Sequence, residues 1–129
     1  MQSRSPNVLL VDDDQGIVNS LVPLLRNGGF TVHKFTDPLA ALEHFADKPE
    51  SFNLLIADAR MPGMSGIELI QKAKRLCPKL KAVLVSAFEI NHISTEKLKG
   101  SEIGIDHIAI KPQSPSELVE IARRLSISD

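Results

Sequence analysis

The sequence has no tryptophan, no tyrosine and one cysteine, and its positive and negative charges nearly cancel. Because a single cysteine, Cys77, cannot form an internal disulfide, we expect a reducing compartment and a cytoplasmic location. No apolar stretch approaches the roughly 20 residues that a membrane-spanning helix requires, so we expect no membrane partner. A net charge of −1 provides no overall basic field, so we expect no direct contact with nucleic acid.

Positive charge is concentrated between residues 72 and 81. No aromatic side chain lies within this cluster to stack on a base, so a solvated helix face explains it better than a nucleic-acid site. Cys77 follows Leu76 on an apolar edge and lacks an obvious activating base, which indicates packing. The basic residues are Lys72, Lys74, Arg75, Lys79 and Lys81.

A chain of 129 residues with 43% apolar content has the size and composition of one globular domain with a buried core. No repeat, low-complexity stretch or internal linker divides it. We therefore expect one domain over residues 8–126, a disordered tail over residues 1–7, and no second domain in this chain.

Short apolar runs alternate with amphipathic segments along the chain. Runs that are apolar throughout predict strands covered on both faces, whereas the alternating run TVHKF is typical of a sheet edge. Five such β/α units predict an α/β domain with a parallel sheet and helices on both faces. The predicted strands are Val8–Val11, Thr31–Phe35, Leu54–Ala57, Ala82–Val85 and Ile108–Ile110.

Capping residues indicate where several helices begin. Asp37 precedes a proline at the first helical position, and Ser65 and Ser114 each stand three residues before a glutamate. Pro23 removes a backbone donor within the first helix, which predicts a bend or a late start there. The predicted helices are about Gly16–Arg26, Leu39–Ala46, Leu69–Leu76, Leu118–Leu125 and a short one at Ser94–Lys99.

Polar side chains follow four of the predicted strands. Asp12 and Asp13 follow the first, Asp58 the third, Ser86 the fourth and Lys111 the fifth. Ligands of parallel α/β sheets gather outside the carboxyl ends of the strands, so we expect these side chains to form one site. Each residue alone has an ordinary structural explanation, such as a helix cap or a turn, and only their co-occurrence favours a site.

Three carboxylates at neighbouring strand ends form an oxygen-rich cup that suits Mg²⁺, which takes one or two protein carboxylates and keeps several waters. A lysine and a hydroxyl opposite the acids suit an anion with tetrahedral oxygens. Mg²⁺ and lysine around such an anion are the apparatus of phosphoryl transfer. An aspartate can then be the nucleophile that becomes an aspartyl phosphate.

The motifs VLLVDDD, LLIADARMPGMSG, VLVSA and IAIKP resemble, in order and spacing, the receiver domains of two-component response regulators. The resemblance covers residues 8–125 and implies a flavodoxin-like five-stranded sheet in the order 2-1-3-4-5. It implies that Asp58 is the phosphoacceptor and that the domain is no enzyme beyond its own phosphorylation and dephosphorylation. It further implies Mg²⁺ ligands from Asp12, Asp13, Asp58 and the Arg60 backbone carbonyl, and phosphoryl contacts from Ser86, Lys111 and the backbone amides of Ala59 and Ala87.

Three features depart from the family pattern. Ile108 stands three residues before Lys111, where receivers usually carry an aromatic side chain that swings inward when the hydroxyl residue, here Ser86, moves. Gln113 stands where phenylalanine is frequent, and the segment between Ser86 and Gly104 is longer than usual. The resemblance therefore implies intact phosphorylation chemistry together with an atypical output switch at Ser86 and Ile108.

The resemblance also implies partners. A sensor histidine kinase or a phosphotransfer protein would donate the phosphoryl group. An output domain beyond the C-terminus of this chain, or a separate effector, would receive the signal, and phosphorylation-dependent dimerisation is a further expectation.

Two alternative interpretations stay open. A degenerate receiver would bind a partner without being phosphorylated, and Ile108 and Gln113 are compatible with that. A haloacid-dehalogenase-like phosphatase would use Asp12 as nucleophile and Asp14 as general acid. Against the phosphatase, 129 residues leave no room for a cap domain, and the stretch from Asp58 to Pro62 would have no role.

Overall fold

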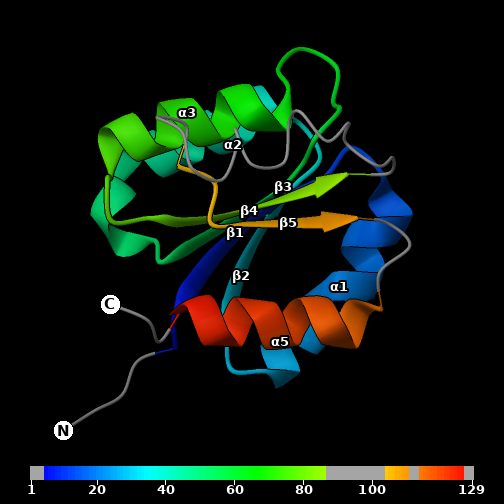
Figure 1. The fold of residues 1–129 in the computed structure, drawn as a ribbon. Coiled ribbons are helices and arrows are strands. Elements are labelled where there is room, and N and C mark those ends of the chain that lie inside the picture. The colour runs from blue at the N-terminus through cyan, green and yellow to red at the C-terminus, as the bar shows by residue number, and fades with distance from the viewer. Residues whose placement is uncertain (1–4, 87–103, 111–113, 127–129) are drawn as a thin grey trace, which may run out of the picture.

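The computed structural model describes residues 5–86, 104–110 and 114–126. Five parallel strands form one sheet in the order β2-β1-β3-β4-β5, with helices on both faces (Figure 1), so the expected fold class and strand order are confirmed. The strands are β1 (Asn7–Val11), β2 (Thr31–Phe35), β3 (Leu54–Asp58), β4 (Lys81–Ser86) and β5 (His107–Ile110). The helices are α1 (Gln15–Asn27), α2 (Pro38–Asp47), the 3₁₀ helix η1 (Pro49–Ser51), α3 (Gly66–Leu76) and α5 (Pro115–Ser126).

The amino end of the sheet extends further than expected. β1 begins at Asn7, and the carbonyl oxygen of the preceding Pro6 accepts a hydrogen bond of 2.9 Å from the backbone amide of Thr31. Asn7, which the sequence placed in the tail over residues 1–7, is therefore the first residue of β1, and Pro6 next to it makes one backbone hydrogen bond to β2. The helix predicted at Ser94–Lys99 lies outside the described residues.

The first helix tolerates its internal proline. α1 starts at Gln15 and continues through Pro23 to Asn27, so the predicted late start was wrong. Buried side chains on both sides of the proline pack in the core and outweigh the lost backbone donor. The buried side chains of α1 are Val18, Leu21, Val22 and Leu25.

The pleat of the strands divides the apolar side chains between two cores. Val8 and Leu10 of β1 belong to the core formed with α1 and α5, and Leu9 and Val11 belong to the core formed with α2 and α3. Figure 1 shows these two helix pairs on opposite faces of the sheet. Cys77 is buried in the second core, which confirms the expectation that it packs. Within the described ranges, no helix is long and apolar enough to cross a bilayer. Because both sheet faces are covered, polar chemistry is confined to the strand ends.

The start of α3 packs directly on the end of β3. The Gly66 amide donates to the Ala59 carbonyl at 3.0 Å, and Ser65 caps the helix by accepting from the Glu68 amide at 3.1 Å. A Cβ added at Gly66 would overlap the backbone carbonyl of Asp58 and lie 2.9 Å from Leu84 Cδ1. Glycine is required at this position by the close approach of two backbones.

We expect Gly66→Ala to destabilise the domain by about 1–3 kcal/mol, because a backbone overlap cannot be relieved by a side-chain rotation. Urea unfolding followed by circular dichroism measures the change. The matched control is Gly16→Ala in the first turn of α1, where the new methyl group would meet only the tip of the Asp14 side chain at 3.2 Å. Equal losses for the two variants would contradict this interpretation.

Candidate functional site

The carboxyl ends of β1 and β3 bring three aspartates together. Asp12 and Asp13 follow β1, and Asp58 is the last residue of β3. One carboxylate oxygen from each of the three lies within 4.8 Å of the others. Asp12 and Asp58 are buried, whereas Asp13 is exposed. The group expected from the sequence is therefore assembled, with one side in the protein and one side open to solvent.

The three consecutive acids after β1 have separate structural roles. The Asp12 backbone amide donates to the Phe35 carbonyl at 3.1 Å, and the side-chain Oδ1 atom of Asp12 accepts from the Asp14 amide at 2.9 Å. Asp14 caps α1, since its Oδ1 accepts from the amides of Gly16 and Ile17. The backbone thus orients Asp12 toward the site and commits Asp14 to the helix, while Asp13 stays at the solvent side.

The donor set and its size suit a small hard cation. Oxygens bound to one Mg²⁺ at about 2.1 Å lie about 3 Å apart when adjacent and about 4.2 Å apart when opposite. The observed spacing of up to 4.8 Å between the three carboxylates is of this order. All three donors are carboxylate oxygens, the ligand type that Mg²⁺ prefers, so the residues present fit this ion.

Ser86 lies at the same edge of the sheet as Asp58. The register pairs Asp58 with Val85 and Ser86 with Ile110, so Ser86 is the next residue along β4 beyond the partner of the aspartate. Ser86 is buried at 6% exposure, whereas Arg60, two residues after Asp58, is exposed. The structure therefore brings Ser86 to the carboxyl edge that carries the acids.

The family resemblance assigns the Ala59 amide to the phosphoryl group, and the structure shows which hydrogen bond this amide makes. The Ala59 amide donates to the Val85 carbonyl at 2.7 Å and so continues the hydrogen-bond ladder between β3 and β4. In this structure the amide is used by the sheet, and its contact with a phosphoryl group stays a prediction. Residue type alone could not predict this bond, because the ladder extends two residues beyond Ala57, the predicted end of the third strand.

Three expected positions near the site lie outside the described residues, namely Lys111, Ala87 and Gln113. The strand that precedes Lys111, β5, pairs its last residue with Ser86 at the carboxyl edge. Ile108 is half-buried and packs against the core formed with α2 and α3. At the position where receivers usually carry an aromatic switch residue, this chain therefore has an aliphatic side chain that packs against the core.

Comparison with known proteins settles the family. The model of the response regulator receiver domain matches residues 8–123. The chain belongs to the response regulator receiver domain family. It is 34% identical over 118 residues to the transcriptional regulatory protein CreB of Escherichia coli, a match that covers 92% of this chain and 49% of CreB. The receiver thus spans about half the length of this curated relative.

Solved structures agree with this assignment. A CheY-like receiver domain protein from Methanospirillum hungatei superposes with a TM-score of 0.82 at 30% identity, covering 97% of this chain and 96% of that one. The BeF3-activated DrrB receiver domain superposes with a TM-score of 0.77 at 25% identity, covering 95% and 97%. The chain is therefore a receiver domain of two-component signalling in both sequence and fold.

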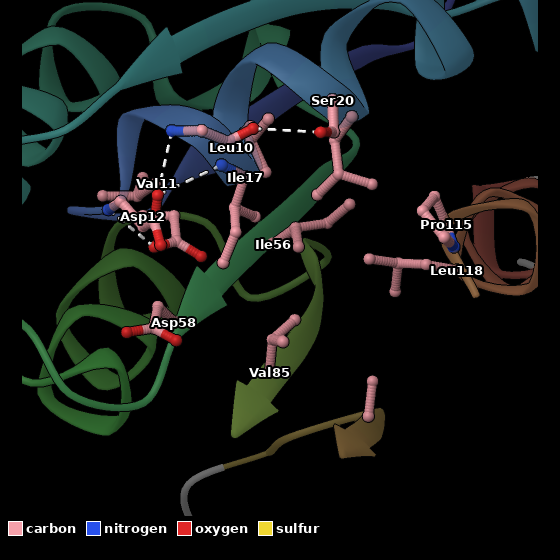
Figure 2. Close-up of a pocket in the computed structure, with 14 residues that line it drawn as sticks. Leu10, Val11, Asp12, Ile17, Ser20, Ile56, Asp58, Val85, Pro115 and Leu118 are labelled. Carbon is pink, nitrogen blue, oxygen red and sulfur yellow. Dashed lines mark hydrogen bonds between the residues drawn. The ribbon is translucent and has the colours of Figure 1, made fainter. Parts of the chain in front are cut away.

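A cavity of about 430 Å³ lies beneath the acids of the receiver, between the sheet and helices α1 and α5. In Figure 2, Asp12 and Asp58 lie at one end of this space and Pro115 and Leu118 of α5 lie across it. Such an apolar border lowers the local dielectric constant and strengthens electrostatic interactions of the two carboxylates. The lining residues described are Leu10, Val11, Asp12, Asp14, Gly16, Ile17, Ser20, Leu21, Ile56, Asp58, Val85, Ala109, Pro115 and Leu118.

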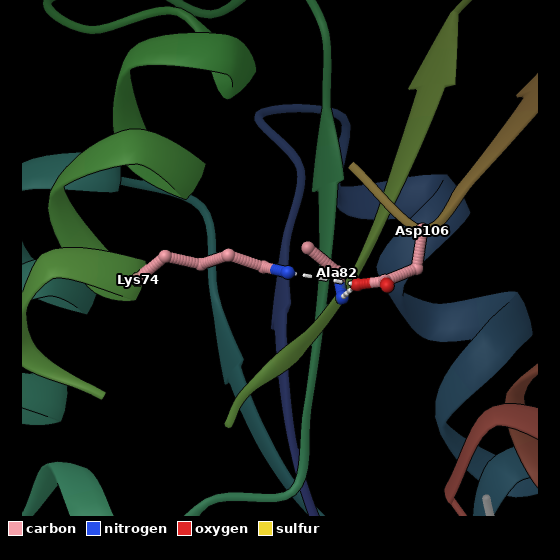
Figure 3. Close-up of polar contacts among 3 residues, drawn as sticks. All are labelled: Lys74, Ala82 and Asp106. Atoms are coloured by element: carbon pink, nitrogen blue, oxygen red, sulfur yellow. Dashed lines mark hydrogen bonds and ion pairs between the residues drawn. The ribbon is translucent and has the colours of Figure 1, made fainter. Parts of the chain in front are cut away.

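The opposite end of the receiver carries a polar contact that the sequence analysis missed. Asp106, just before β5, accepts from Lys74 Nζ in α3 at 2.9 Å and from the Ala82 amide in β4 at 2.8 Å, both through Oδ2 (Figure 3). Ala82 is fully buried, so this carboxylate satisfies a donor that water cannot reach. For Lys74, the interpretation as part of a solvated face was wrong, because the side chain reaches back to Asp106.

We expect Asp106→Ala to cost about 2 kcal/mol of unfolding free energy, because it leaves the buried Ala82 amide without its acceptor. Lys74→Met removes only the partly exposed ion pair and should cost less than about 1 kcal/mol. Asp106→Asn keeps an acceptor for the Ala82 amide, so its loss of unfolding free energy should be closer to that of Lys74→Met than to that of Asp106→Ala. Chemical unfolding ranks the three variants, and an equal loss for Lys74→Met and Asp106→Ala would contradict the assignment.

Proposed function

We propose that this receiver domain accepts a phosphoryl group on Asp58, in a Mg²⁺-dependent reaction, from a sensor histidine kinase or a phosphotransfer protein. The observation that supports the proposal is the convergence of Asp12, Asp13 and Asp58 at the carboxyl edge of the sheet, within 4.8 Å of one another. Family membership and the burial of Asp58 at the end of β3 agree with it.

In this proposal the cation is held by Asp12, Asp13, Asp58 and the backbone carbonyl of Arg60. Bound there, Mg²⁺ supplies positive charge against the carboxylates and the incoming phosphoryl oxygens. The Asp14 amide and the pairing with Phe35 keep Asp12 oriented, so little side-chain freedom is lost when a cation binds.

The chemical step uses one carboxylate oxygen of Asp58. This oxygen attacks phosphorus, an oxygen–phosphorus bond forms, and the bond between phosphorus and the donor breaks, with the donor leaving with its electron pair. The Ser86 hydroxyl donates to a phosphoryl oxygen from the neighbouring strand. Lys111 and the Ala87 amide complete the phosphoryl contacts that the family motif assigns, and the domain catalyses nothing beyond its own phosphorylation and dephosphorylation.

The output of the domain is proposed to be atypical. Ile108 packs in the core and offers no ring that could move when Ser86 shifts. Signal transmission would then use another element and reach an output domain outside this chain, a separate effector, or a second phosphorylated copy in a dimer. The proposal also includes one domain over residues 8–126 and a cytoplasmic location, without direct nucleic-acid contact by this domain.

Incubation with acetyl phosphate and Mg²⁺ should add one phosphoryl group of about 80 Da, because a small-molecule donor can replace the kinase once Asp58 is positioned. Intact-mass spectrometry measures the adduct, which should be labile at alkaline pH and should not form when Mg²⁺ is chelated before the donor is added. Asp58→Asn should show no adduct. Asp47→Asn, an exposed acid of α2, is the matched control and should be modified like the wild type.

An adduct that persists in Asp58→Asn would show that another residue is the phosphoacceptor and would contradict the proposal. No adduct on the wild type, with Mg²⁺ binding intact, would favour the degenerate receiver. Sustained hydrolysis of a phosphomonoester that depends on Asp12 would favour the phosphatase.

We expect Asp13→Asn to weaken Mg²⁺ binding by at least about tenfold, or 1.4 kcal/mol, because a charged ligand is replaced by a neutral one. The chain has no tryptophan or tyrosine, so amide chemical shifts in a Mg²⁺ titration are a better measurement than fluorescence. Asp47→Asn again serves as control. Wild type that fails to bind Mg²⁺ at millimolar concentration would contradict the proposed cofactor.

A further inference from the structure

Two histidines face each other near the opposite edge of the sheet from β5. His33 of β2 and His44 of α2 place Nδ1 and Nε2, respectively, 3.1 Å apart. His33 is half-buried, and His44 is exposed on its helix. Neither residue takes part in the proposed phosphorylation of Asp58, and no family motif used above includes them.

Phenylalanine rings hold both imidazoles in place. Phe52 packs edge-on against His33 with ring centroids 4.9 Å apart, and Phe35 lies 5.2 Å from His44. Phe52 also contacts His44 at 5.9 Å. Packing that limits the positions of the two rings reduces the entropy that is lost when a ligand binds.

A hydrogen-bond chain favours one of the two neutral tautomers of His33. Asn7 donates from Nδ2 to the Ser51 carbonyl at 2.8 Å, and its Oδ1 lies 3.4 Å from His33 Nε2. An oxygen acceptor beside Nε2 favours the proton on that nitrogen and leaves a lone pair on Nδ1, which faces His44. Metal-binding histidines usually donate their other ring N–H to such an acceptor.

The charge state also suits a metal ligand. Burial lowers the pKa of His33 below its ordinary value, and the neighbouring His44 lowers the pKa further. A lowered pKa favours neutral imidazole, which is the form that binds metals.

The distance between the two nitrogens matches a shared ion. Two nitrogens bound to one Zn²⁺ at about 2.0–2.1 Å, with an angle between about 90° and 110°, lie roughly 2.9–3.4 Å apart. Imidazole suits zinc, copper and nickel, whereas Mg²⁺ takes oxygen ligands. We propose that His33 Nδ1 and His44 Nε2 form a second metal site, which takes a first-row transition-metal cation such as Zn²⁺.

Binding requires small rearrangements. The proton of His44 moves from Nε2 to Nδ1, and both rings rotate so that their lone pairs converge on the ion. In the part of the chain that the structure describes, the only group of three or more His, Cys, Asp or Glu ligand atoms is that of Asp12, Asp13 and Asp58. The histidine pair therefore supplies two ligands, and water fills the other positions.

Zn²⁺ titration by calorimetry, at neutral pH in excess Mg²⁺ that occupies the acidic group, tests the proposal. The wild type should bind one Zn²⁺, and His44→Gln and His33→Gln should each weaken it at least tenfold. His107→Gln, the same substitution in β5, is the matched control and should bind like the wild type. In nitrogen-detected NMR spectra, the imidazole signals of His33 and His44 should shift with Zn²⁺ while those of His107 stay.

Circular dichroism verifies the fold of each variant, and because His44 is exposed and His33 is half-buried, His44→Gln should disturb the packing less than His33→Gln. Equal Zn²⁺ affinity in the wild type and His44→Gln would overturn the proposal. So would Zn²⁺ binding that is lost in Asp13→Asn and retained in His44→Gln, since the acidic group would then be the site. Both results are independent of whether Asp58 is phosphorylated.

Discussion

Parallel pairing of β1 with β3 places two buried carboxylates side by side at the carboxyl ends of these strands, and the rest of the site depends on this pairing. Two negative charges about 5 Å apart repel by about 3 kcal/mol at an effective dielectric constant near 20. Each strand residue buried between the two helical layers contributes about 1.5–3 kcal/mol, so a few of them outweigh the repulsion. The fold therefore holds the acids together and leaves a favourable position for a cation.

Helix α3 runs from the carboxyl ends of the strands, where the acids lie, to their amino ends. Its first residue, Gly66, lies against the Asp58 backbone, and Lys74 near its last turn contacts Asp106 before β5. Any displacement of the Asp58 backbone is therefore opposed by a helix whose other end is fixed to β4 and β5. Ser86 and Ile110, the paired ends of these two strands, lie on the same rigid frame as the acids.

Local signals in the sequence predicted the elements well. Apolar runs located the strands to within a residue or so, and the caps at Asp37 and Ser65 form as expected, because both depend on neighbours a few residues away. The rule that ligands gather at carboxyl ends then located the acids. The order of the strands was not readable from periodicity and came from the family resemblance.

What the sequence could not predict depends on long-range packing. Lys74 and Asp106 are 32 residues apart, and the ladder that takes up the Ala59 amide joins two separate strands. The histidine pair joins β2 to α2 only because the right-handed crossover brings that helix over its strand. In each case the sequence shows the type and charge of a residue, but it does not show which distant residue will be its contact partner.

The few aromatic residues of this chain are unevenly distributed over the fold. Three of the five phenylalanines, Phe35, Phe45 and Phe52, gather around β2 and α2, two of them in contact with His44. The position on β5 that usually carries the moving ring holds Ile108 instead. Phe35 also connects the two regions, since its carbonyl accepts from the Asp12 amide while its ring packs on His44. The backbone of Asp12 is thus hydrogen-bonded to β2, the strand around which three phenylalanines of the described residues gather.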